Sequence, residues 1–306
     1  MTTTTARPAQ TKLLQPRDRQ QTASRLLASH AKLHFDPLVD VDWEAGLVPG
    51  MPYADPRRLS LYGTELWDRM TEEQRLELGK HEVASIASIG IWFELILMQM
   101  LVRNAYHRDA TTPHVQFALT EIADECRHST MFAKMIAAFG AKQYKVDRKV
   151  HHLSRLFKAT STPTQTFAGT MYVEEILDAF QREAMDDERL QPMVRTVSRI
   201  HVVEESRHIS YARDEMLRRE LTPLQRRYEQ LVLGAIVYFA TTQLIRPDAY
   251  AAVGLDPVEA TAAAAANPHW RRTKTDMAAK AVDVLTQAGL VGRTNRWLLV
   301  KAGVLS

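Results

Sequence analysis

The sequence predicts an all-α protein. Apolar residues recur at the three- and four-residue spacing of helices that bury one face, and no stretch alternates apolar and polar residues as a strand does. Capping boxes of the form Thr-x-x-Gln begin at Thr71 and Thr162, where the two side chains satisfy backbone N–H groups at a helix start, and Thr222-Pro-Leu-Gln225 opens a further helix.

Five long helices form the centre of the predicted fold. They cover residues 71–106, 113–139, 162–188, 193–219 and 222–245, with Gly140 as the stop of the second. An amphipathic helix at 22–34 and an extended arm at 36–58 precede them, and the basic connection 141–161 is partly helical. After residue 245 an alanine-rich stretch, with breaks at Pro257 and Pro268, leads to two short helical patterns at 273–288 and 295–304.

Composition is that of a soluble globular protein. Of 306 residues, 45% are apolar and 25% are charged, and the net charge of +3 is spread along helices, which excludes a nucleic-acid partner. The single cysteine, Cys126, excludes an internal disulfide, favours a cytoplasmic location and is expected to be buried. Residues 1–20 lack the apolar region of a secretory signal and are expected to be a disordered lead-in.

One segment, 83–102, is apolar and long enough to cross a bilayer. It carries Glu94 near its centre and Gln99 soon after, and a glutamate in the middle of a membrane is costly. The segment is therefore expected to lie inside a helical bundle, without a membrane partner.

Two copies of Glu-x-Arg-His indicate a metal site. His201, Glu205 and His208 fall within an arc of about 60° on one helix, and Glu125 and His128 share a face on another. Such inward-facing pairs are typical of ferritin-like four-helix bundles with a dinuclear metal centre, here with accessory N- and C-terminal helices.

Two further glutamates complete this predicted set. Thirty-one residues separate Glu94 from Glu125, and thirty-one separate Glu174 from Glu205. With a turn roughly midway, each pair is expected at a similar height on antiparallel neighbouring helices. Glu82 is too far from the turn to be level with Glu125. Glu175 remains an alternative to Glu174, because a one-residue error in helical phase exchanges them.

The residue types favour iron or manganese over structural zinc, because the set combines carboxylates and imidazoles without thiolate. Two Fe(II) ions can together reduce O2 by two electrons. We also expect Asp124 and Glu204 to orient the histidines, with Arg127 and Arg207 pairing to them. Asp178 is a second candidate for this role.

The segments DECRH at 124–128 and HVVEESRHISYAR at 201–213, with the Glu174 to His201 separation, resemble the para-aminobenzoate N-oxygenase family of di-iron proteins. The resemblance covers about 71–245. Its specific feature is His201, a third histidine one turn before the last ligand glutamate. Glu121 has the equivalent position on the other ligand helix and is not expected to be a ligand.

The resemblance implies that Glu94, Glu125 and His128 hold one iron, that Glu174, His201 and His208 hold the other, and that the catalytic residue Glu205 bridges them. It implies O2-dependent oxidation of an aryl amine through hydroxylamine and nitroso to nitro, with electrons from a ferredoxin or reductase. No arginine can be assigned to a substrate carboxylate, and Arg103 and Arg195 are expected on solvated faces.

Other functions remain open at this point. The same site serves a C–H hydroxylase or desaturase, although His201 favours N-oxygenation, and a ferritin-like iron-binding protein is a further alternative. We expect one domain over 1–306, with the bundle at 71–245 and accessory helices at 246–306. The helix at 222–245 could mediate a homodimer.

Overall fold

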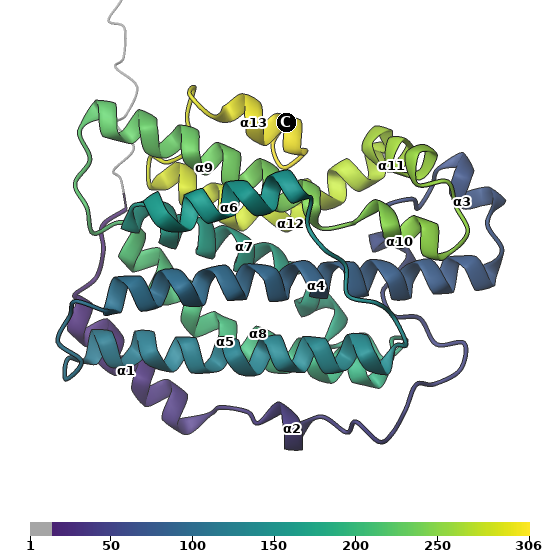
Figure 1. Cartoon of the computed structure of the whole chain (residues 1–306), viewed down its shortest axis with the longest axis horizontal. Coiled ribbons are helices and arrows are strands. Elements are labelled where there is room, and N and C mark those ends of the chain that lie inside the picture. Colours follow the sequence, from purple (N-terminus) through teal and green to yellow (C-terminus); the bar gives the residue numbers. More distant parts are fainter. Residues whose placement is uncertain (1–13) are drawn as a thin grey trace, which may run out of the picture.

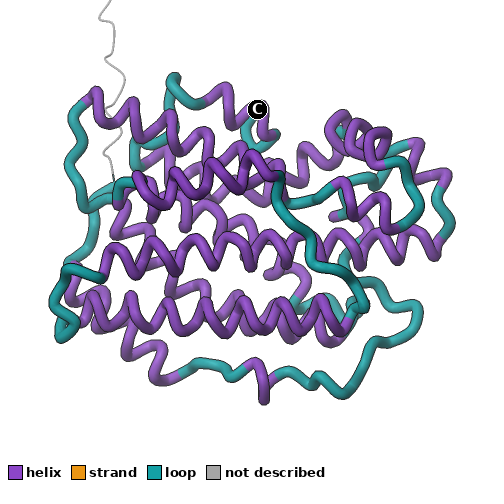
Figure 2. The backbone as a smooth tube through the Cα atoms, viewed as in Figure 1, coloured by secondary structure: helices purple, strands orange, loops and turns teal. Residues whose placement is uncertain are grey.

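The computed structural model describes residues 14–306, and every regular element in that range is a helix (Figure 2). Residues 1–13 of the predicted lead-in lie outside the described residues. The helices are α1 (Arg19–Lys32), α2 (Pro37–Asp40), the 3-10 helix η1 (Pro56–Arg58), α3 (Glu65–Arg69), α4 (Glu72–Ala105), α5 (Pro113–Ala138), α6 (Arg148–Thr160), α7 (Pro163–Ala184), α8 (Pro192–Met216), α9 (Pro223–Gln243), α10 (Pro247–Ala252), α11 (Pro257–Ala266), α12 (Pro268–Gln287) and α13 (Arg296–Ala302).

Four long helices surround the centre of the molecule. Helix α4 packs against α5 and α7, and α8 packs against the same two, so the cyclic order is α4–α5–α8–α7. Figure 1 shows α4 and α5 running side by side along the molecule. Helix α1 lies against α5 and α8, α6 lies against α4, and α9 and α12 cover α7, with α13 on α9.

The helix starts follow from local chemistry. Thr71 Oγ1 accepts a hydrogen bond from Gln74 N at 3.1 Å, and Gln74 Oε1 accepts one from Thr71 N at 3.1 Å, which confirms this predicted capping box. The boxes at Thr162 and Thr222 are also complete. Gly140, at φ +66°, follows the end of α5.

The predicted breaks at Pro257 and Pro268 are present, because α10 ends at Ala252 before α11 begins at Pro257, and α11 ends at Ala266 before α12 begins at Pro268. Both prolines stand in the first turn of a helix, α11 and α12, where the missing N–H removes no intrahelical hydrogen bond. Asp256 and Asn267 cap these helices through their side chains. The lead-in also ends earlier than expected, because Arg17 Nε donates to Asp214 at 2.9 Å.

Helix α4 is long and apolar enough to cross a membrane by length and composition, and 67% of its most apolar window is buried inside the protein. Two apolar clusters account for this burial. On α4, Leu78 and Ile91 belong to one cluster, and Leu97 and Leu101 belong to the other. Glu94, which is fully buried, lies between Ile91 of one cluster and Leu97 of the other, in a polar layer of the interior.

Glu82 is a buried carboxyl group elsewhere on α4, with 2% exposure. Ser60 donates to it from its backbone N, at 3.0 Å, and from its hydroxyl, which is 2.8 Å from the Tyr250 hydroxyl. Burial raises the pKa of Glu82 from 4.5 to about 7, although the Ser60 hydrogen bonds act against this. The folded state therefore prefers the protonated acid.

This pKa shift predicts a pH dependence of stability. The contribution of Glu82 is fully present below about pH 4.5 and is lost as the pH rises through 7. We expect the free energy of unfolding to fall by roughly 2 kcal/mol between pH 5 and pH 8 on this account. Urea unfolding of wild type and of Glu82→Gln at both pH values measures this fall in the free energy of unfolding. An equally large fall in the variant would contradict the assignment to Glu82.

Candidate metal centre

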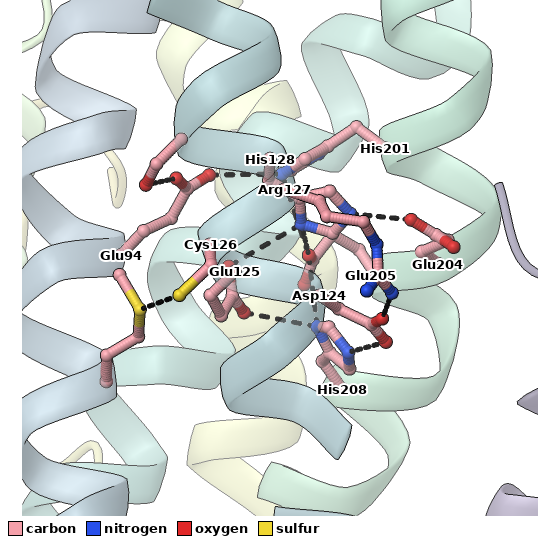
Figure 3. Close-up of polar contacts among 12 residues, drawn as sticks. Glu94, Asp124, Glu125, Cys126, Arg127, His128, His201, Glu204, Glu205 and His208 are labelled. Carbon is pink, nitrogen blue, oxygen red and sulfur yellow. Dashed lines mark hydrogen bonds and ion pairs between the residues drawn. The ribbon is translucent and has the colours of Figure 1, made fainter. Parts of the chain in front are cut away.

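The structure brings together all seven residues that the sequence singles out for metal binding. Figure 3 shows six of them, all except Glu174. Their ligand atoms form three overlapping groups, and within each group the atoms lie within 4.8 Å of one another. The groups are Glu125, His128, Glu205 and His208; Glu94, His128 and His201; and Glu174, His201 and Glu205.

The four central helices each contribute to this site. Glu94 comes from α4 and Glu174 from α7, while α5 and α8 supply the Glu-x-Arg-His pairs and α8 also supplies His201. Residues three or four apart on a helix share one face, which aims each set inward. Glu175, the alternative to Glu174, lies 2.8 Å from Lys280 instead.

Glu205 lies at the centre of the cluster. Its Oε1 is 3.1 Å from His128 Nδ1, 3.1 Å from His208 Nδ1 and 3.6 Å from His201 Nε2. One carboxylate oxygen therefore faces a nitrogen of each of the three histidines. A carboxylate in this position is placed to be shared by two cations.

Two carboxylates contact the histidine nitrogens that point away from Glu205, as the sequence predicts. His128 Nε2 is 2.8 Å from Glu204 Oε2, and His208 Nε2 is 3.2 Å from Asp124 Oδ2. Each contact joins α5 to α8. Such a contact fixes the ring orientation and directs the other nitrogen, Nδ1, into the site.

The predicted arginine pairs are also present. Arg127 donates to Asp124, and Arg207 Nη2 lies 3.6 Å from Glu204 Oε1. Asp178, the other candidate for orienting a histidine, instead accepts two hydrogen bonds from Arg182, at 2.7 and 3.1 Å.

Two contacts from α1 and the following segment were missed by the sequence reasoning. His30 Nε2 lies 3.2 Å from Asp124 Oδ1, and Phe35 N donates to Glu204 Oε1 at 3.0 Å. Neither residue belongs to a recognisable spacing with the cluster. They reach it only because α1 packs against α5 and α8.

The surroundings shift the pKa values of two carboxyl groups in this layer in opposite directions. Burial raises the pKa of Asp124, but the hydrogen bond with His208 and the charges of Arg127 and His30 outweigh it and bring that pKa to about 2. Burial and the neighbouring carboxylates raise the pKa of Glu174 well above its usual value. Without a cation, the layer therefore contains carboxyl groups that are costly to ionise.

The unpaired atoms of the cluster fit metal ions. Buried polar atoms in proteins normally have a partner. Within residues 14–306, those without a hydrogen bond include Glu94 Oε1, both oxygens of Glu125, Glu174 Oε2, Glu205 Oε2 and both nitrogens of His201. Oxygen and imidazole donors converging in a buried site, with no thiolate, are suited to iron or manganese.

Cys126 and Glu121 lie beside this site without belonging to the three groups. The expectation that Cys126 is buried is wrong: it is exposed, with its sulfur 3.3 Å from Met98 Sδ. Its position, about 100° from Glu125 on α5, turns it away from the interior. Glu121 is fully buried, and both its oxygens lack a partner among the described residues.

Glu204→Ala is expected to lower the affinity of the cluster for a divalent metal ion roughly 10–100-fold, because it removes the group that orients His128. Anaerobic titration calorimetry with Fe(II) measures the change. Ser206→Ala, at an exposed position of the same helix, serves as the control. Equal affinities for Glu204→Ala and the control would contradict the orienting role.

The fold and the site together define an all-helical protein with buried carboxylate and histidine clusters able to bind metal. The family model of p-aminobenzoate N-oxygenase AurF matches residues 16–289. The chain belongs to this family, as its resemblance predicts. The match extends well beyond 71–245 and includes α1, which supplies His30.

Three curated relatives are uncharacterized mycobacterial proteins, one from Mycobacterium bovis and two from strains of Mycobacterium tuberculosis. Each is 30% identical over 203 residues, which cover 63% of this chain. The chain spans 59% of the length of these relatives.

Proposed function

We propose that α4, α5, α7 and α8 form a ferritin-like four-helix bundle that holds two iron ions. Residues 71–245 are its core, 246–306 are accessory helices, and the whole chain is one domain. The ligands are the seven residues of the cluster, with Glu205 shared between the two ions. Support comes from the position of Glu205 Oε1 among three histidine nitrogens and from the unpaired donor atoms.

The protein is a di-iron monooxygenase that oxidises the nitrogen of an aryl amine to hydroxylamine, nitroso or nitro product. The observation that carries this proposal is His201, fully buried and 3.7 Å from Glu94 and 3.6 Å from Glu205. A third histidine at this place is the feature that relates the chain to N-oxygenases rather than to C–H hydroxylases and desaturases. Membership of the family supports the same reaction.

When bound, the two Fe(II) ions supply the electrons for a two-electron reduction of O2. The residues of the chain perform the remaining tasks. Glu204 and Asp124 hold the rings of His128 and His208, and the apolar clusters on either side keep bulk water from the polar layer. Glu174 lines a cavity and is placed where the amine of a substrate would meet the site.

The reaction needs electrons from outside the chain, and a ferredoxin or reductase is the proposed partner. A cytoplasmic location fits a single free cysteine and the burial of most of the apolar window of α4. A homodimer would place α9 at its interface.

The test is anaerobic loading with Fe(II), chemical reduction and exposure to ¹⁸O2 with a panel of aryl amines, with products identified by mass spectrometry. We expect ¹⁸O on the amine nitrogen. Oxygen on carbon alone would favour the hydroxylase alternative. Failure to bind stoichiometric iron would remove the basis of both reactions.

A further inference from the structure

A large cavity leads to the cluster from one side of the molecule. Its volume is about 580 Å³, within the range of sites that enclose drug-sized ligands. Its walls come from α4, α6, α7, α9 and α13. Glu174, only 2% exposed, lines it, and so do Trp92 and Phe93, which directly precede Glu94.

The cavity has no cation with which to bind a carboxylate. Among the described residues that line it, none is lysine, arginine or histidine, and Glu174 is the only acid. Arg103 and Arg195, the arginines near the ends of ligand helices, are absent from the lining, and Arg103 instead donates to Ser161 at 2.7 and 2.8 Å. A substrate carboxylate here would lose its hydration without gaining a counter-ion.

One uncharged donor in the cavity lacks a partner. Gln165 is 2% exposed, and its Oε1 accepts from Thr162 N at 3.2 Å in the capping box of α7. Its Nε2 has no hydrogen bond within the described part of the chain. A buried donor without an acceptor is unfavourable, so the site is suited to a ligand with a neutral oxygen. Gln165 and Glu174 are separated by about 13 Å of helix rise.

The rim of the cavity is apolar and exposed. Leu153 and Leu156 of α6 are 48% and 61% exposed, Tyr228 and Leu231 of α9 are 53% and 48% exposed, and Trp297 of α13 is 57% exposed. Exposed apolar side chains grouped at an opening mark an entry for apolar molecules. The ligand therefore meets apolar surface from the rim inward.

We propose that the substrate is an uncharged, largely apolar aryl amine without a carboxylate, bulkier than p-aminobenzoate. It binds in this cavity with its amine at Glu174 and a neutral carbonyl or ether oxygen at Gln165. This inference rests on the proposed N-oxygenase function, because the amine is placed at the iron ligand.

Butyl 4-aminobenzoate and 4-aminobenzoate form a matched pair of probes, since they share the aryl amine and differ in the neutral ester. Their dissociation constants are measured anaerobically on the reduced, iron-loaded protein by quenching of tryptophan fluorescence, because Trp92 and Trp297 line the cavity. We expect the ester to bind at least about tenfold more tightly. Equal or tighter binding of the acid overturns the proposal.

Gln165→Glu tests whether the amide N–H of Gln165 binds the neutral oxygen of the ligand, a contact called the anchor below. Glutamate retains the acceptor of the capping box but removes the free amide N–H. Binding of the ester should weaken several-fold more than binding of 4-butylaniline, which has no acceptor. Gln225→Glu makes the same change in the capping box of α9, outside the cavity lining, and should alter neither. Equal weakening of both ligands by Gln165→Glu would assign Gln165 a structural role alone and overturn the anchor.

A larger side chain in the lining of the cavity tests whether the ester binds there. Ala235→Phe should weaken binding of the ester, whereas Ala265→Phe, at an exposed position of α11, should not.

Products formed after addition of O2 separate this inference from the proposed function. Tight ester binding without oxidation of nitrogen would keep the substrate class and remove the N-oxygenase reaction. Oxidation of the nitrogen together with tighter binding of the acid would support the N-oxygenase reaction and overturn the proposed substrate class.

Discussion

Glu205→Ala is expected to abolish stoichiometric iron binding and to lower the formation of N-oxygenated product by more than two orders of magnitude. Loss of a group that only orients a ligand costs roughly 10–100-fold, so loss of the shared ligand should cost more. The physical reason is the position of Glu205 Oε1, 3.1 Å from both His128 Nδ1 and His208 Nδ1. A colorimetric iron assay and mass spectrometry of products measure the two effects.

Glu220→Ala is the matched control, because this exposed glutamate lies just beyond α8 and makes no contact with the cluster. The control should bind iron and form product as the wild type does. A Glu205→Ala protein that keeps its full iron content and activity would show that Glu205 is not the shared ligand.

Glu174→Gln is expected to raise the free energy of unfolding of the metal-free protein by about 1–3 kcal/mol and to reduce the stabilisation that iron provides. Glu174 is 2% exposed, and its Oε2 has no partner among the described residues. Burial and the charges of Glu205 and Glu125 disfavour its ionised form. A neutral amide of the same shape removes this cost but is a poorer iron ligand.

Glu175→Gln provides the comparison, because the adjacent side chain is buried but pairs with Lys280 at 2.8 Å. It should stabilise the metal-free protein less than Glu174→Gln does, because Lys280 offsets part of the effect of burial on the Glu175 pKa, and its response to iron should match that of wild type. Chemical unfolding with and without Fe(II), under anaerobic conditions, measures both variants. A metal-free Glu174→Gln protein less stable than wild type would contradict the prediction.

Helix starts could be predicted where the signal is local. The capping boxes at Thr71 and Thr162 satisfy backbone N–H groups with side chains three residues away, so their sequence is sufficient. The breaks at Pro257 and Pro268 were predicted correctly, but the sequence analysis did not predict that each proline begins a helix, because proline is excluded from a helix interior yet is compatible with its first turn. The capping side chains before them, Asp256 and Asn267, were the available signal.

The orientation of single side chains was harder to predict. Cys126 adjoins a residue of the cluster, and a small apolar side chain is usually buried. Its exposure depends on which face of α5 its neighbours cover. The free amide of Gln165 also escaped notice, because the capping box accounts for its oxygen and only the surrounding helices reveal that the residue lines a cavity.

The sequence by itself determined the helical class and the grouping of Glu125 with His128 and of His201 with Glu205 and His208. These follow from helix geometry, because residues three or four apart share a face wherever the helix lies. Only the tertiary structure decided the contacts of His30 and Phe35 with the cluster and the uncharged cavity beside Glu174. Such features join segments far apart in the chain, and they depend on how helices pack rather than on any local spacing.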